Sequence, residues 1–83
     1  MAVWRVIYEG PLQAWEATAQ PGPDVLVEVL SWLMELTESG PPADQLPVPL
    51  EEDLYVARVA GTAVLVTYLA LAYERLVVIR RID

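Results

Sequence analysis

Apolar residues follow a helical spacing over 11–39 and a strand-like spacing over 2–9 and 53–82. The clearest element is a helix over 23–39, which Pro23 begins and Ser39-Gly40-Pro41 ends. Its charged residues and Ser31 share one narrow stripe, formed by Asp24, Glu28, Ser31, Glu35 and Glu38. A helix on a sheet needs an apolar arc of only about 100°. Nearly all other positions of this helix are apolar, so its apolar arc covers well over half of the circumference. The apolar surface that the sheet does not cover must contact a preceding helix, the chain's own loops or another molecule.

The other segments predict strands and one more helix. We expect a strand over 2–9, covered on more than one side, and a short helix over about 11–19 that Gly10-Pro11 opens. A proline-rich connector over 40–53 with an edge-like stretch around Val48 precedes strands over 53–60, 62–71 and 75–82. The segment 62–71 is almost wholly apolar, as in a central strand buried on both faces. A helix over 66–76 is the alternative, because 71–74 lack a residue for a tight turn.

The order of elements is β-α-α-β-β-β, and 83 residues are enough for one domain. We therefore predict a single α+β domain over 1–83, with a small antiparallel-rich twisted sheet and a helical hairpin packed on one face.

Charge and apolar content together point to a partner. The chain carries a net charge of −7, yet 55% of its residues are hydrophobic. Much apolar content in a small domain leaves exposed apolar surface, which often marks a binding site. Trp15, Trp32 and Met34 are candidate partner-binding residues, with the core as the alternative for both tryptophans. We expect a homo-oligomer, such as a homodimer, or a complex formed through the helical hairpin or an edge strand.

Several residue types are missing. The chain has no Cys, His or Lys, which excludes thiolate zinc sites, histidine-based triads and Schiff-base lysines. We expect no cofactor and no metal. The longest uncharged run, 59–73, is too short to span a bilayer, and the N-terminus lacks a signal-peptide pattern. We therefore expect a cytoplasmic protein without a membrane partner.

The pattern resembles the RelE/ParE superfamily of bacterial toxins from toxin–antitoxin systems. The resemblance rests on 4–8 as opening strand, the helix 23–39, and the strands 54–61, 64–68 and 76–79. It implies an antitoxin partner that wraps the toxin with a mostly helical tail. It also implies one of two activities: ribosome-dependent mRNA cleavage by a basic cluster, or binding to DNA gyrase without that cluster.

Candidate catalytic residues are Arg58, Arg80 and Arg81. Arg58 matches the basic residue on the second strand of the family, whereas Val56 stands where many nucleases of the family have a second one. The alternative is that these arginines are solvent-facing and pair with acids of 51–53. The acidic net charge disfavours an RNA or ribosome partner. Three functions stay open: a toxin that binds a protein target, an mRNA interferase, and a non-toxic interaction or dimerisation module.

Overall fold

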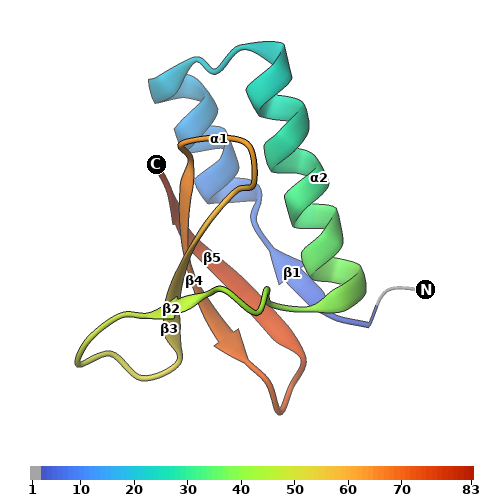
Figure 1. Ribbon diagram of the computed structural model, residues 1–83, viewed down its shortest axis with the longest axis vertical. Helices are drawn as coiled ribbons and strands as arrows, with labels where there is room; N and C mark the ends of the chain where they lie inside the picture. Colours follow the sequence, from blue (N-terminus) through green and yellow to red (C-terminus); the bar gives the residue numbers. More distant parts are fainter. Residues whose placement is uncertain (1–2) are drawn as a thin grey trace.

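The computed structural model describes residues 3–83 and contains two helices and five strands (Figure 1). In chain order they are β1 (Arg5–Ile7), α1 (Glu9–Ala19), α2 (Pro23–Ser39), β2 (Leu46–Pro47), β3 (Leu54–Arg58), β4 (Leu65–Leu71) and β5 (Leu76–Ile82). The predicted α+β class and the helix over 23–39 are confirmed. The start of the strand predicted over 2–9 lies outside the described residues.

The helix α1 begins two residues earlier than predicted, at Glu9. Pro11 is its third residue, where the missing N–H costs nothing because the first N–H groups of a helix have no intrahelical partner. The helix ends at Ala19, and the next residue, Gln20, caps it in a left-handed conformation (φ 47°, ψ 57°) and donates its backbone N–H to the carbonyl of Glu16. Left-handed residues commonly end helices, although glycine is the usual choice.

The sheet has the strand order β1-β5-β4-β3-β2. β1 runs parallel to β5, and the other pairs are antiparallel. The central place predicted for 62–71 is confirmed for β4. The expectation that the first strand is covered on more than one side is wrong, because β1 is an edge strand with exposed Arg5 and Ile7.

Two segments outside the long strands complete the sheet: the connector before β3 and the turn between β4 and β5. The connector contributes β2, just before the predicted edge-like stretch, and an edge position tolerates Pro47. The strands β4 and β5 are joined by a turn in which Arg75 takes a positive φ of 51° and donates its N–H to Ala72. Arg75 therefore adopts the left-handed conformation that a glycine usually adopts in such a turn. The alternative prediction of a helix over 66–76 is wrong.

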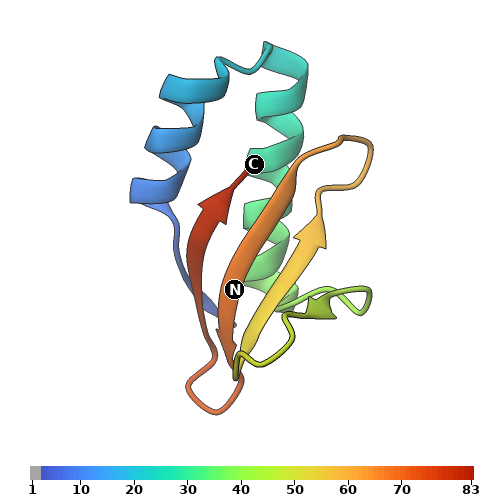
Figure 2. The same cartoon turned by 90° about the vertical axis from the view of Figure 1, so that its left-hand side faces the viewer.

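Both helices cover the same face of the sheet, so the molecule has two layers. Figure 2 shows α2 behind β3, β4 and β5, and α1 at the left beside β5. The core between the layers centres on Tyr68, which is fully buried and lies edge-on to Trp32 with ring centroids 6.0 Å apart. Within residues 3–83, no helix is long and apolar enough to cross a bilayer.

Candidate functional site

One face of the sheet has no helix against it (Figure 2), and we call it the open face. Side chains alternate along a strand, so Leu65 lies on this face while Val66 is buried in the core. The pairing registers carry the alternation across all five strands. The open face is aliphatic apart from one threonine and three arginines, and consists of Arg5, Ile7, Leu46, Leu54, Val56, Arg58, Leu65, Thr67, Leu69, Leu71, Leu76, Val78 and Arg81.

This arrangement corrects the expectation that 62–71 is buried on both faces. Leu69 and Leu71 are half-buried only by their neighbours on the sheet, and Leu65 is 45% exposed. Leu46 at the edge is 64% exposed. A contiguous apolar surface of this kind is typical of a protein-binding site.

The candidate arginines are distributed over two strands. Arg58 pairs in register with Leu65, and Arg81 with Thr67, so both lie on the open face, two strands apart. A register shift opposite Thr67 and Tyr68 leaves Arg80 as the extra residue of a bulge. The structure therefore brings Arg58 and Arg81 to one face.

The acids of 51–53 do not pair with these arginines. The ion pair found within residues 3–83 joins Arg81 Nε to the Asp83 carboxylate at 2.8 Å. Both side chains are largely exposed, so the pair contributes little stability. It nevertheless neutralises part of the positive charge at the end of β5. The interpretation of Arg58 as solvent-facing is supported by its exposure.

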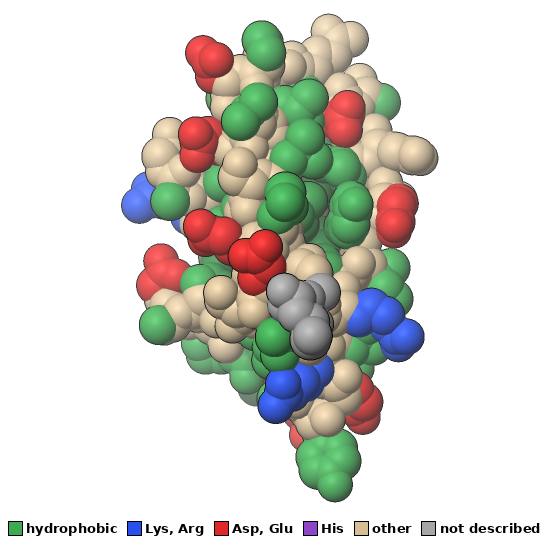
Figure 3. All heavy atoms as spheres, turned by 90° about the vertical axis from the view of Figure 1, so that its right-hand side faces the viewer, with side chains coloured by type: hydrophobic (Ala, Val, Ile, Leu, Met, Phe, Trp, Pro, Cys, Tyr) green, Lys and Arg blue, Asp and Glu red, His purple; other side chains and the backbone are tan. Residues whose placement is uncertain are grey.

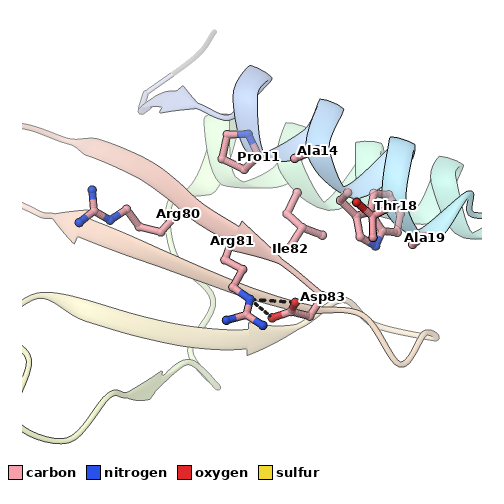
Figure 4. Close-up of a pocket in the computed structure, with 9 residues that line it drawn as sticks. Pro11, Ala14, Thr18, Ala19, Arg80, Arg81, Ile82 and Asp83 are labelled. Atoms are coloured by element: carbon pink, nitrogen blue, oxygen red, sulfur yellow. Dashed lines mark hydrogen bonds and ion pairs between the residues drawn. The ribbon is translucent and has the colours of Figure 1, made fainter.

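A hollow of about 360 Å³ lies beside this ion pair, between α1 and the end of β5 (Figure 4). Pro11, Ala14 and Thr18 line it from the helix, while Arg80 and Arg81 line it from the strand and extend in different directions. Because β1 pairs only with the first three residues of β5, the rest of that strand has α1 beside it instead of another strand.

Opposite charges are separated between the two layers. The helices carry acids and no basic residue: Glu9, Glu16, Asp24, Glu28, Glu35 and Glu38. The strands carry arginines and no acid: Arg5, Arg58, Arg80 and Arg81. The net charge of −7 therefore hides an acidic helix layer and an arginine-bearing sheet. A sum over the sequence cannot show this separation, because it adds the charges of both layers.

The tyrosines offer little acid–base chemistry on the open face. Tyr68 is buried on the helix side and donates its hydroxyl to Gln45 Oε1 at 2.6 Å. Burial, the Asp44 carboxylate and Tyr55 together raise the pKa of Tyr68 above its ordinary value. Tyr55 packs against the same core, and Tyr73 is fully exposed at the β4–β5 turn. Among the described residues no cluster of three metal-ligating side chains occurs.

The candidate partner-binding residues fall into two classes. Trp15 and Trp32 are buried in the core, with 6% and 9% of their surface exposed. Met34 is 65% exposed on α2, beside Val27 and Leu30, which are also exposed. Of the three candidates, Met34 is therefore accessible to a partner, and the two tryptophans belong to the core. Sequence analysis did not single out Val27 and Leu30, although their spacing from Met34 contains the signal.

No protein-family model and no curated protein matches the chain. Among solved structures, it is similar to the free state of Escherichia coli toxin RelE carrying two arginine-to-alanine substitutions. The TM-score is 0.66 at 18% identity, and the match covers 100% of this chain and 83% of the other. The chain therefore has the RelE-like fold.

Proposed function

We propose that this protein is the toxin-like component of a bacterial toxin–antitoxin pair, and that it acts by binding a protein through the open face. The observation that carries the proposal is the composition of that face. Aliphatic side chains form most of it, and its arginines stand at the margins of the apolar area, on β1, β3 and the end of β5. Aliphatic surface with peripheral arginine matches protein interfaces better than it matches a phosphate-binding groove.

Catalysis of RNA cleavage has less support. Stabilising the transition state needs cations close to the reacting phosphate, and proton transfer needs an acid or base within reach. Arg58 and Arg81 stand two strands apart, and Arg81 is bound to Asp83. The carboxylate found at the open face among the described residues is that of Asp83, and it is held in the ion pair with Arg81.

An mRNA interferase remains the second candidate, because one observation favours it. The arginines gather on the sheet layer while the helix layer holds the acids, so the open face is locally basic. A polyanion could approach this side despite the acidic net charge. The third candidate, a non-toxic interaction module, shares the same apolar surface.

Induced expression in a bacterial host tests the proposal. We expect growth arrest with intact cellular mRNA, and we expect Leu65→Glu to relieve the arrest because it places a charge in the apolar open face. The matched control is Leu50→Glu, at a fully exposed leucine of the connector. Circular dichroism checks that both variants fold.

Each outcome separates the candidates. Arrest with cleaved mRNA that Arg58→Ala abolishes would establish the interferase instead. Normal growth at full expression would leave the interaction module. Arrest that Leu65→Glu and Leu50→Glu affect equally would overturn the assignment to the open face.

A further inference from the structure

Two opposite sides of the molecule both leave apolar side chains uncovered. Figure 2 views the open face, and Figure 3 views the outer side of α2 from the opposite direction. Leu65 and Leu46 are exposed on the open face, and Val27 and Met34 are exposed on α2. The two layers therefore bury their inner surfaces against each other and leave an apolar area on each outer side.

The exposed apolar residues of α2 form a stripe, which we call the outer stripe. Val27, Leu30 and Met34 follow one another at spacings of three and four residues, so they lie on one side of the helix. The sheet is on the other side, where the Trp32 ring packs edge-on against Tyr68. Figure 3 shows a strip of hydrophobic side chains running down the helix layer.

The borders of these two areas carry opposite charges. Asp24 lies three residues before Val27 and Glu38 four residues after Met34, so both acids are helix-surface neighbours of the outer stripe. Figure 3 shows acidic groups on both sides of the strip. The charged side chains on the strands of the open face are all arginines: Arg5, Arg58 and Arg81. An apolar area with acidic borders is therefore present on one side, and an apolar area with arginines at its margins on the other.

We propose that the outer side of α2 in one copy of this chain binds the open face of a second copy, head to tail. Apolar side chains meet in the middle of this contact, and acids meet arginines at its margins. A symmetric dimer joins two like faces, which brings acids against acids or arginines against arginines. Because the two faces lie on opposite sides, each bound copy keeps one face free and the contact repeats from copy to copy.

We expect this association to be weak. Five strands, with seven residues in β4, give the open face a footprint of at most roughly 450 Å². Each partner in a standard stable interface buries about 800 Å². All copies also share the net charge of −7, which opposes their approach. The inference does not depend on the proposed toxin function, because it concerns the purified chain alone.

Sedimentation equilibrium of the full chain, from micromolar to millimolar concentration, tests the proposal. The mean mass should rise with concentration without stopping at a dimer, because the contact repeats. Leu65→Glu blocks the open face and Met34→Glu blocks the outer stripe, since each places a charge in an apolar contact. Each should weaken self-association about tenfold or more. Leu50→Glu, at an exposed leucine of the connector, should leave it within about twofold.

A mixture of the two blocked variants distinguishes a head-to-tail contact from a symmetric one. The Leu65→Glu protein keeps its outer stripe and the Met34→Glu protein keeps its open face, so the mixture should form 1:1 dimers and stop there. The two blocked faces both carry glutamate and repel each other. Dimers that persist in Met34→Glu alone would show sheet-to-sheet pairing, and dimers that persist in Leu65→Glu alone would show helix-to-helix pairing. Either result would overturn the proposal.

A pair of arginine variants tests the charge match. Arg58→Glu should weaken self-association more than Arg75→Glu, which makes the same change of net charge at the β4–β5 turn. Equal losses would overturn the charge complementarity on which the proposal rests. A wild-type chain that stays monomeric at millimolar concentration, or a mixture of blocked variants without dimers, would overturn it as well.

Discussion

The indole ring of Trp4 occupies the space that a side chain at Gly40 would need. A methyl carbon added to Gly40 would lie 2.5 Å from Trp4 Nε1, closer than real contacts allow. Gly40 ends α2 with φ 80° and ψ −170°, a backbone conformation open to glycine only. The residue therefore ends the helix and makes room for the chain that enters β1.

Gly40→Ala should lower the free energy of unfolding by about 2–4 kcal/mol, because backbone strain and overpacking add. Urea denaturation measures the loss. The control is Gly10→Ala, at a helical position with open space, which should be neutral or stabilising by up to about 1 kcal/mol. Equal effects at the two sites would contradict the packing of Trp4 on Gly40.

Gln20→Gly should act in the opposite direction. Gln20 holds a left-handed conformation at the end of α1, which costs a non-glycine residue roughly 1 kcal/mol. Replacement by glycine removes that cost, and we expect a gain of up to about 1 kcal/mol in thermal or urea unfolding. Ala19→Gly, inside the same helix, should instead lose about 0.5–1 kcal/mol. A loss in both variants would exclude strain at Gln20.

Alanine substitutions at Trp32 and Met34 should affect stability very differently, because Trp32 lies in the core and Met34 on the surface. Trp32→Ala removes a buried ring that packs on Tyr68, and should cost about 3–5 kcal/mol of stability. Met34→Ala removes a mostly exposed side chain and should change stability by less than about 0.5 kcal/mol. Thermal unfolding followed by circular dichroism compares them. A stable Trp32→Ala protein would show that the indole is not part of the core.

The raised pKa of Tyr68 predicts instability in alkali. The hydroxyl stays protonated in the folded protein above pH 10, whereas in the unfolded chain it ionises near pH 10. The unfolded state therefore binds fewer protons, so stability is complete below pH 10 and falls above it by about 1.4 kcal/mol per pH unit for this one group.

Urea denaturation between pH 8 and about 11.5 measures that slope. Tyr68→Phe should remove it, and should cost about 1 kcal/mol at neutral pH through the lost bond to Gln45. Tyr73→Phe, at a fully exposed tyrosine, is the control and should keep the slope. A slope that survives in Tyr68→Phe would assign the pH dependence to other groups.

Local signals explain why much of the fold could be predicted. Proline at the start and glycine at the end fix α2 at Pro23–Ser39, because both act through the backbone of their own residues. The sequence places the start of α1 two residues too late, because proline is as acceptable at the third helical position as at the first. The apolar run of β4 identified a central strand. Residue type alone could not show which of its apolar side chains lie on the open face and which lie in the core.

The candidate site was harder to predict because it depends on pairing between distant segments. Nothing near Arg58 in the sequence says that Arg81 shares its face, since this follows from the register of two strand pairs and from the bulge at Arg80. The separation of charge between helices and strands is likewise a property of the layers. The burial of Trp15 could not be predicted, because a tryptophan that shares a helix face with Leu12 and Ala19 fits the core and a partner surface equally well.

The parallel pairing of β1 with β5 also sets an order of assembly. Arg5 pairs with Leu76, so the contact closes a loop of roughly seventy residues for only three residues of strand. Local hairpins such as β4–β5 form before contacts of that range, and an edge strand so short adds little to the folding nucleus. Assembly should therefore begin in the β3–β5 meander and finish when β1 docks between β5 and the end of α2. The amide protons of β1 should exchange with solvent through local opening, long before those of β4.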